Sequence, residues 1–493
     1  MAESKAASAS EYMQKTHLTE SLQEVLNELL QTRPDDAYGE LTRLLRARSL
    51  PPTIDRVVGR EVLDSRGNPT VEVDVYAKRY GKIFFAGRSS APSGASTGSN
   101  EARELRDTES PRYFGKGTLT AARNVTEELS PALHGLKFDD LSALDRVIQN
   151  ADGTELKEHI GGNACTATSF ALAESAAKLN HVQLFEYLAK QFHGEDMPQK
   201  FKLPTPFFNI LNGGKHAGGN LKLQEFMVSP KSDAPFPDQL RMVAEVYQKL
   251  GEILVETYGV SAKNLGDEGG FAPLLNTPEE AISVIEKAIV AAGYEPGTDI
   301  KLGLDAAASE FYNSDDKTYE VEVGVIKTGE EMIQYWKDLV EAHPAVVSIE
   351  DGLHETDYEN WAKLNEELGD KIQLVGDDLY TTNPNTIRKG LEGKWANALL
   401  LKVNQIGTIS EAMEAARLIL DAGQNVMVSH RSGETGNSLI ADLAVAIGAQ
   451  SIKTGSTARG ERIQKYTRLL QIYEYLVEND MLDVGAGEGG EQE

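Results

Sequence analysis

The sequence predicts a mixed α/β protein: a closed α/β barrel preceded by an N-terminal α+β capping domain and a short helical-hairpin extension. Short apolar runs that each end in a polar residue and each precede a helix predict the barrel. Alternating apolar and polar residues predict strands of the capping domain, and two leucine-rich stripes before them predict the extension. With 493 residues, the chain has the length of about three ordinary domains.

Composition and charge exclude several classes of protein. The chain has 49 Lys and Arg against 76 Asp and Glu, a formal net charge of −27 at pH 7. So acidic a surface repels phosphate groups, and we expect no nucleic-acid partner. No apolar run approaches the roughly 18 residues that cross a bilayer, so we expect no membrane insertion. The single cysteine, Cys165, excludes an internal disulfide and indicates a reducing, cytoplasmic location.

The predicted extension comprises residues 18–52 and follows residues 1–17, which we expect to be disordered. Its segment LTESLQEVLNELLQTRPDDAYGELTRLLRAR carries two apolar stripes at helical spacing, separated by the break RPDD. A Pro51-Pro52 pair ends the unit. Two helices of this size cannot bury their stripes alone, so we expect them to dimerise or to dock on another surface.

Residues 53–198 form the predicted capping domain. Their first part, TIDRVVGREVLDSRGNPTVEVDVYAKRYGKIFFAGRSS, alternates apolar and polar residues around the turn signal RGNP, as antiparallel strands do. A helical stretch rich in Ala and Leu follows, from about Asn163 to Gln191. This combination favours an α+β domain.

Residues 199–480 repeat one unit, a short apolar strand that ends in a polar residue and is followed by a helix. Successive strand ends are 45, 27, 25, 28 and 23 residues apart, close to the roughly 30 residues of one unit in a TIM-like barrel. Parallel strands of a closed barrel end at one rim, so we expect these polar residues to converge there. They are Asp305, Glu350, Asp377, Lys402, His430 and Lys453. Residues 481–493 form an acidic, glycine-rich tail.

Three of these strand ends are carboxylates, Asp305, Glu350 and Asp377. Left unpaired, they would repel one another strongly, and a hard divalent cation with oxygen ligands relieves that repulsion. Mg²⁺ is the natural ion for such a set. The alternative is that each acid caps the helix that follows it, but three acids in succession favour a metal site.

Lys402 follows the apolar run ALLL without a break. Burial at a strand end lowers the pKa of a lysine, and a nearby dication acts in the same direction. A neutral amine at this position can act as a general base. The alternative is a lysine that pairs with Asp377 or Asp378.

A local basic cluster interrupts the acidic background. His430, Arg431 and Ser432 lie between a strand and a glycine-led turn, where a guanidinium, a hydroxyl and backbone N–H groups suit an anion such as phosphate. Lys453, at the next strand end, adds a positive charge. The cluster indicates an anion site; the alternative is a set of ordinary caps and surface charges.

Three glycine-rich segments carry further polar residues. In LNGGKHAGGNLKLQEFM, His216 and Glu225 flank tight turns, and in NLGDEGGFAP, Glu268 lies among glycines whose backbone freedom can aim it into a cavity. The small residues of SAPSGASTGSNEA, from Ser93 to Ser99, are typical of a mobile lid that closes over a ligand.

Taken together, these segments resemble the enolase family, the phosphopyruvate hydratases of glycolysis. The resemblance extends from about Val57 to Leu476 and rests on motifs in the family's order. These motifs are LDSRGNPTVEV, PSGASTG, NGGKHAGG, LQEFM, GDEGG, SIEDG, GDDL, LLLKVNQIGT, SHRSGET and IKTG. The resemblance implies reversible dehydration of 2-phosphoglycerate to phosphoenolpyruvate by a homodimer with two Mg²⁺ in each active site.

The resemblance also implies a role for each candidate residue. Lys402 would be the base that removes the proton from carbon 2 of the substrate. Glu268 would be the acid that helps hydroxide leave carbon 3, with Glu225 assisting. The other roles would be divided as follows: Asp305, Glu350 and Asp377 for one Mg²⁺, Ser96 for the second, Arg431 and Ser432 for the phosphate, Lys453 for the substrate carboxylate, and His216 and His430 for the pocket wall.

Two departures from the family pattern are visible. After SHRSGET, Gly436-Asn437 replaces the usual acidic pair, outside the expected substrate contacts. The larger departure is the extension, which resembles the dimerisation and docking domain of cAMP-dependent protein kinase regulatory subunits. In that family, paired helical hairpins bind an amphipathic helix. The resemblance implies an anchoring protein bound through residues 18–48 and an association with a cilium, a flagellum or the cytoskeleton.

Three alternatives remain open. The chain could be a catalytically silent scaffold with the enolase fold in a cytoskeletal or ciliary assembly, but a scaffold is expected to have lost Lys402, Glu268 or a metal ligand. It could be another acid dehydratase of the enolase superfamily, although the phosphate cluster and the Ser-Gly-Ala-Ser-Thr lid favour a phosphorylated substrate. The extension could also be a helical addition without a partner.

Overall fold

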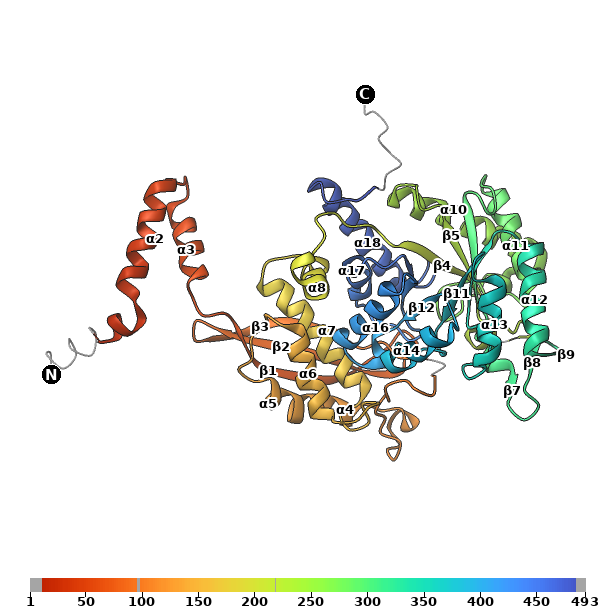
Figure 1. Ribbon diagram of the computed structural model, residues 1–493, viewed down its shortest axis with the longest axis horizontal. Coiled ribbons are helices and arrows are strands. Elements are labelled where there is room, and N and C mark those ends of the chain that lie inside the picture. Colours follow the sequence, from red (N-terminus) through yellow and green to blue (C-terminus); the bar gives the residue numbers. More distant parts are fainter. Residues whose placement is uncertain (1–10, 95–97, 218, 485–493) are drawn as a thin grey trace, which may run out of the picture.

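The computed structural model describes residues 11–94, 98–217 and 219–484, which form a helical hairpin, a capping domain and a closed barrel (Figure 1). The predicted fold class is therefore confirmed. Residues 11–16, which we expected to be disordered, are helical and exposed, in keeping with the helix-favouring residues Glu11, Met13 and Lys15. Residues 1–10 and 485–493 lie outside the described part of the chain.

The hairpin consists of α2 (Leu18–Thr32) and α3 (Ala37–Ala47). The two helices pack through the buried side chains of Val25 and Leu44. Asp36 caps α3, because its Oδ1 accepts a hydrogen bond from the backbone N–H of Gly39 at 2.8 Å. In Figure 1 the hairpin stands to one side of the other two parts and joins them through an extended segment.

The capping domain contains a three-stranded antiparallel sheet in the order β1-β2-β3. Its strands are β1 (Thr53–Leu63), β2 (Pro69–Arg79) and β3 (Lys82–Ser90). Its helices are α4 (Leu119–Asn124), α5 (Ser130–Leu133), α6 (Leu141–Asp152), α7 (Gly162–Leu179) and α8 (Leu184–His193), with the π-helical turn η2 (Val125–Leu129) between α4 and α5. Nearly all of α7 is buried, because it packs against β2 and β3.

The barrel closes from eight strands in the order β10-β11-β12-β13-β14-β4-β5-β6. The strands are β4 (Thr205–Asn212), β5 (Glu225–Pro230), β6 (Ile300–Asp305), β10 (Val346–Glu350), β11 (Gln373–Gly376), β12 (Ala398–Leu401), β13 (Asn425–Ser429) and β14 (Ser451–Lys453). A separate apolar cluster that includes Phe207, Met227 and Leu400 fills the interior. The interior of the barrel is thus a packed apolar core.

One strand differs from the all-parallel barrel that the repeat predicted. β5 runs antiparallel to both β4 and β6. Its first residue, Glu225, therefore lies at the rim where the parallel strands end. The register pairs Glu225 with Asp305, and Asp305 with Glu350, so three carboxylates stand side by side. The local apolar pattern of a short buried strand is the same in either direction, which is why the sequence did not reveal this reversal.

Helices surround the barrel and a small sheet extends from it (Figure 1). The helices include α10 (Phe236–Tyr258), α11 (Pro278–Ala291), α12 (Gly329–Ala342), α13 (Tyr358–Leu368), α14 (Pro384–Gly393), α16 (Ile409–Asp421), α17 (Leu439–Ala446) and α18 (Gly460–Glu478). The small sheet contains β7 (Tyr312–Asn313), β8 (Thr318–Glu322) and β9 (Val325–Thr328). In the described part of the chain, no helix combines the length and the apolarity that crossing a membrane requires.

Loops of the capping domain lie against the barrel rim. The backbone N–H of Ser65 donates to the carbonyl of Glu434 at 2.7 Å, and that of Ala102 donates to the carbonyl of Gln405 at 2.7 Å. Ser93 forms an isolated bridge with Gly433. The loops after β1 and β3 therefore cover the rim on which the polar strand ends gather.

Candidate active site

Three of the six polar strand ends, Lys402, His430 and Lys453, line one small pocket at the barrel rim. The other three, Asp305, Glu350 and Asp377, do not line it but form ion pairs with its two lysines. The free space in this pocket is about 20 Å³. Its lining residues are His216, Gln224, Glu225, Glu268, Lys402, His430, Arg431, Ser432 and Lys453. All of these except Gln224 were expected from the sequence, so residues that are far apart in the chain converge as the barrel interpretation predicted.

Lys453 lies among three of the rim carboxylates. Its Nζ is 2.7 Å from Glu350 Oε2 and 3.3 Å from both Asp305 Oδ2 and Glu225 Oε2. Burial alone would lower the pKa of Lys453, but the carboxylates outweigh it and raise the pKa well above its usual value. Lys453 is therefore a fixed positive charge at the centre of an acidic cluster.

Lys402 pairs with Asp377, the third of the carboxylates that were predicted to bind metal. Nζ of Lys402 donates to Oδ2 of Asp377 at 2.5 Å, and both side chains are largely buried. Burial opposes the charged amine, yet Asp377 outweighs it and the pKa of Lys402 is raised. This differs from the lowered pKa expected from burial and a nearby dication, because the carboxylate of Asp377 lies at hydrogen-bonding distance. The alternative pairing with Asp377 is the one present.

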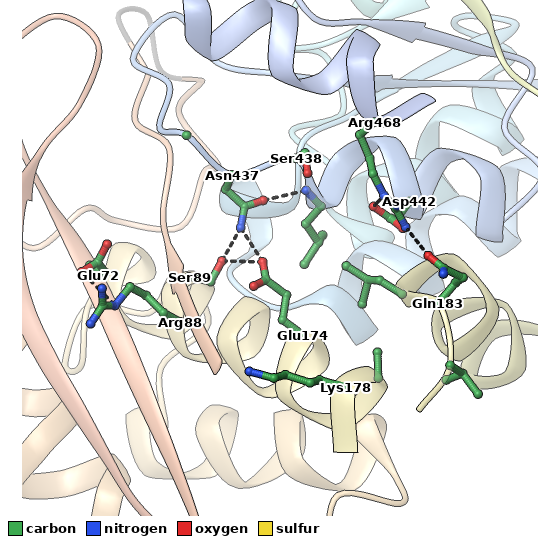
Figure 2. A pocket seen from close by; sticks show the side chains of 15 residues that line it. Glu72, Arg88, Ser89, Glu174, Lys178, Gln183, Asn437, Ser438, Asp442 and Arg468 are labelled. Carbon is green, nitrogen blue, oxygen red and sulfur yellow. Dashed lines mark hydrogen bonds and ion pairs between the residues drawn. The ribbon is translucent and has the colours of Figure 1, made fainter. Parts of the chain in front are cut away.

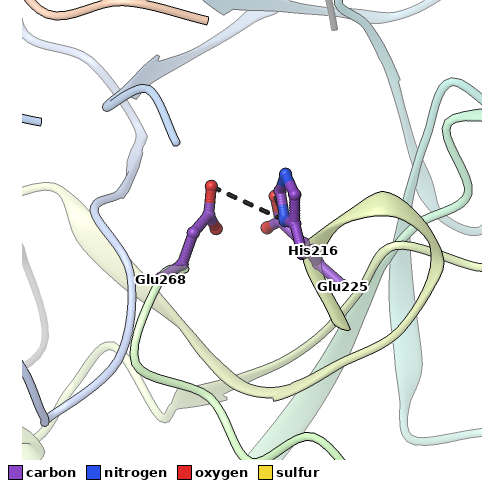
Figure 3. Close-up of side chains that lie close together, drawn as sticks. All are labelled: His216, Glu225 and Glu268. Carbon is purple, nitrogen blue, oxygen red and sulfur yellow. Dashed lines mark ion pairs between the residues drawn. The ribbon is translucent and has the colours of Figure 1, made fainter. Parts of the chain in front are cut away.

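Two carboxylates and an imidazole face one another (Figure 3), and Lys453 lies beside one of the carboxylates, Glu225. His216, in the short helix α9 (Gly214–Ala217), places Nδ1 3.7 Å from Glu268 Oε1 and 3.9 Å from Glu225 Oε1. Burial and the charge of Glu268 raise the pKa of Glu225 well above its usual value. Burial opposes the charged form of Glu268 as well, but the neighbouring imidazoles outweigh it and lower its pKa, so Glu225 binds a proton more tightly than Glu268 does.

His430 forms the opposite wall of this group. Burial lowers the pKa of His430 to about 4, so its imidazole is neutral at pH 7. Arg462 donates from Nη1 to His430 Nδ1 at 2.5 Å, which leaves the protonated Nε2 facing Glu268 Oε2 at 3.4 Å. The buried guanidinium of Arg462 thus fixes both the tautomer and the orientation of His430.

Arg431 and Ser432 follow His430 directly and are buried at the rim. The guanidinium of Arg431 donates to Glu101 Oε2 at 2.9 Å and to Asn404 Oδ1 at 3.1 Å. Ser432 Oγ accepts from Arg66 at 3.4 Å. Two guanidinium groups and a hydroxyl at one corner of the pocket suit an anionic group of a ligand.

The rim has more carboxylates than cations, which suits a divalent metal ion. Asp351, Asp377 and Asp378 bring oxygens within 4.8 Å of one another. Burial, and then the charge of Asp377, raises the pKa of both Asp351 and Asp378 well above the usual value. The buried Oε1 of Gln224, beside Asp305, accepts no hydrogen bond from the described residues. This oxygen-rich donor set has the chemistry that Mg²⁺ prefers.

Some site residues were missed or cannot be placed. Ser96 lies outside the described residues, as does the centre of the lid. Gln224 was missed although it precedes Glu225 directly in the LQEFM motif. Glu101, which contacts Arg431, was missed because an acid after a small-residue loop carries no signal of its own.

A larger cavity of about 520 Å³ lies away from this pocket, between the capping domain and the barrel (Figure 2). Asn437, one of the two departures from the family pattern, donates from its amide to Glu174 Oε1 on α7 at 2.6 Å and also contacts Ser89 Oγ. Asn437, which stands in place of an acidic residue, therefore contributes to the contact between the capping domain and the barrel. It does not line the pocket at the rim.

Comparison with known proteins identifies the family. The family model "Enolase, N-terminal domain" matches residues 54–188, and "Enolase, C-terminal TIM barrel domain" matches residues 200–487. An enolase of Methanopyrus kandleri is 51% identical over 425 residues, which cover 86% of this chain and 96% of the relative. An enolase of Pyrococcus furiosus is 47% identical over 426 residues, with the same coverage of both chains. The hairpin precedes both matched regions, and from the capping domain onward the chain belongs to the enolase family.

Proposed function

We propose that this enolase dehydrates 2-phosphoglycerate to phosphoenolpyruvate, reversibly and with Mg²⁺, in the pocket at the barrel rim. Membership of the family makes the protein a phosphopyruvate hydratase, a lyase of glycolysis. The observation that supports this site most strongly is the convergence of Lys402, the Glu225–Glu268 pair and the Arg431 corner around one enclosed space. Base, acid and anion-binding groups thus lie within reach of one small substrate.

In the proposed reaction, Lys402 removes the proton from carbon 2. That proton lies beside a carboxylate, so its removal places additional negative charge on the carboxylate oxygens. Lys453 is aimed at the same region and stabilises this charge without reorganising, because the surrounding acids already fix its position. Bound Mg²⁺ would supply further Lewis-acid stabilisation of these oxygens. Lys402 must be neutral to accept the proton, which requires its contact with Asp377 to weaken.

The Glu225–Glu268 pair completes the reaction at carbon 3. The electron pair left on carbon 2 forms the double bond to carbon 3 as the bond from carbon 3 to its hydroxyl breaks. Glu268, with Glu225 assisting, supplies the proton that the pair shares, and this proton lets the hydroxyl leave as water. The raised pKa of Glu225 supports a proton held by the pair. Asn209 donates to Glu268 Oε2 at 2.9 Å, and the imidazoles of His216 and His430 lie beside the same carboxylate.

We assign the substrate phosphate to Arg431 and Ser432 and the substrate carboxylate to Lys453. Asp305, Glu350 and Asp377 would hold one Mg²⁺, and Ser96 would contribute to a second, giving two per active site. The excess of buried carboxylates at the rim supports this assignment.

We further propose that the protein is a cytoplasmic homodimer whose hairpin binds an amphipathic helix of an anchoring protein at a cilium, a flagellum or the cytoskeleton. Exposed apolar side chains on the hairpin support a partner: Leu26 is 49% exposed, Leu30 68% and Tyr38 84%. The proposed units are residues 18–52 for docking, 53–198 for the cap, 199–480 for the barrel and 481–493 for the tail.

Turnover of 2-phosphoglycerate tests the catalytic proposal. The carbon–carbon double bond of the product is conjugated with its carboxylate, so ultraviolet absorbance should rise when 2-phosphoglycerate is added together with Mg²⁺. A silent scaffold would give no rise with a folded, metal-loaded protein. Another acid dehydratase would convert a non-phosphorylated hydroxy acid in preference to 2-phosphoglycerate.

A further inference from the structure

Gln405 lies fully buried between two carboxylates of the rim. It belongs to the short helix α15 (Val403–Ile406), three residues after Lys402, and its side chain has no exposed surface. Its Nε2 donates to Asp377 Oδ1 at 2.8 Å and to Glu101 Oε1 at 3.1 Å. Both hydrogens of the amide are therefore used, each by a carboxylate oxygen.

The orientation of this amide is fixed from its other end. The backbone N–H of Lys402 donates to Thr382 Oγ1 at 2.9 Å, so the hydroxyl acts as an acceptor there. Thr382 Oγ1 in turn donates to Gln405 Oε1 at 2.8 Å. Because the Thr382 hydroxyl donates to the amide oxygen, the NH₂ group of Gln405 faces the two acids. The flipped amide would place its oxygen against both carboxylates, which is unfavourable.

The consequence for Asp377 is that its two oxygens have different partners. Gln405 occupies Oδ1, while Oδ2 faces Lys402. An uncharged donor of fixed geometry thus prevents the carboxylate from rotating without adding a charge that competes with a metal ion or with Lys402. Glu101, the other acceptor, binds Arg431, so the same amide also touches the anion-binding corner.

We infer that Gln405 is a positioning residue that holds the Asp377 carboxylate in the orientation needed to bind Mg²⁺ and to face Lys402. The inference rests on the proposed function of this site and adds a residue to which no role was assigned. Hydrogen-bond partners of metal ligands typically change metal affinity or activity by about 10- to 100-fold when they are removed.

The test compares Gln405→Met, which keeps the side-chain length but removes both donors, with the wild-type full-length protein. Mg²⁺ binding is measured by isothermal titration calorimetry, kcat and KM for 2-phosphoglycerate by steady-state kinetics, and folding by thermal unfolding. We expect Mg²⁺ affinity and kcat each to fall by about 10- to 100-fold. KM should change less, because Arg431 keeps its hydrogen bonds to Asn404 and Glu101 although Glu101 loses the donor from Gln405. Thr382→Val, which frees the amide orientation but leaves Gln405 in place, should show a smaller loss of both.

The matched control is Gln239→Met in α10, which changes a buried glutamine outside the pocket and should leave Mg²⁺ affinity and kcat unchanged. Unchanged Mg²⁺ affinity in a folded Gln405→Met protein overturns the inference. The inference is also overturned if the fall in kcat is fully explained by a smaller fraction of folded protein. If Gln405→Met does not fold, Thr382→Val decides by the same measurements. A wild-type protein that binds Mg²⁺ but does not turn over 2-phosphoglycerate would contradict the proposed function, whereas the calorimetric comparison would still decide the role of Gln405.

Discussion

Lys402 and Asp377 form a buried ion pair, with Nζ 2.5 Å from Oδ2, although 25 positions separate them in the chain. Asp377 directly follows β11 and Lys402 directly follows β12, and these strands are parallel neighbours in the barrel. The pair therefore follows from the fold itself. The ion pair links a proposed metal ligand to the proposed base. Binding of a metal ion to Asp377 would therefore change the charge state of Lys402.

Lys402→Ala should abolish turnover and leave substrate binding measurable. Loss of a general base typically costs about 10²- to 10⁴-fold in rate, while Arg431, Ser432 and Lys453 remain to hold the substrate. Kinetics and calorimetry with 2-phosphoglycerate make the distinction. Lys157→Ala, which removes a buried lysine paired with Glu411 away from the pocket, is the matched control and should retain turnover per folded molecule. A near-normal rate in Lys402→Ala would remove this residue from the base role.

Removal of divalent metal should stop turnover reversibly. The rim acids repel one another, and Lys453 and Lys402 neutralise only part of their charge. We therefore expect a chelator to eliminate activity and added Mg²⁺ to restore it. Mg²⁺ should also raise the thermal unfolding temperature, because it binds the folded state selectively. Activity that survives complete chelation would contradict the carboxylate interpretation.

Glu174→Gln should change how stability depends on pH. Burial raises the pKa of Glu174 from 4.5 to about 7, despite hydrogen bonds from Asn437 and Ser89. When the pKa of an acid is higher in the folded state than in the unfolded state, the protein becomes less stable as pH rises from the lower pKa to the higher one. The reason is that the unfolded state releases the proton first. A tenfold change in a protonation equilibrium corresponds to about 1.4 kcal/mol. Between about pH 4.5 and about pH 8, the wild type should therefore lose up to about 3 kcal/mol of unfolding free energy that Glu174→Gln keeps.

Denaturant unfolding of both proteins at the two ends of this range gives the difference. Equal pH dependence in the wild type and in Glu174→Gln would show that Glu174 does not titrate across the range, and the expected effect would be refuted.

Deleting residues 1–52 should leave turnover intact and abolish localisation to a filament or cilium. The hairpin contributes no residue to the pocket, and α2 packs on α3 rather than on the barrel. Kinetics of the truncated protein and imaging of a tagged copy test the two parts. A less drastic variant, Leu26→Glu with Leu30→Glu, should act like the deletion because it places charges on the exposed apolar face. An unchanged distribution would contradict the docking proposal.

Much of this architecture could be predicted from the sequence because each barrel strand carries its own signal. Apolar runs that end in Asp305, Glu350 or Lys402 mark the rim directly, and closure of the barrel brings the strand ends together. The reversal of β5 left no such signal, since a buried strand is apolar throughout in either direction. Its effect was nevertheless to place Glu225 beside Asp305.

The sequence predicted which residues line the pocket better than it predicted which of them pair with one another. Side-chain lengths across the rim decide which acids Lys453 contacts, and these are Glu225, Asp305 and Glu350. The direction of the pKa shift of Lys402 depends on whether burial or the pairing with Asp377 has the larger effect, and the sequence alone left both open. Gln405 was missed because a glutamine after a strand end has no distinguishing feature until its three partners are placed around it.

The most direct test of the central claim is exchange of the carbon 2 proton of 2-phosphoglycerate in deuterated water, in Glu268→Gln and Lys402→Ala proteins loaded with Mg²⁺. If Lys402 takes the proton and Glu268 acts afterwards at carbon 3, Glu268→Gln should incorporate deuterium without forming phosphoenolpyruvate, and Lys402→Ala should do neither. Deuterium incorporation by Lys402→Ala at the rate of Glu268→Gln would show that another group removes the proton, and the assignment of the rim would be wrong.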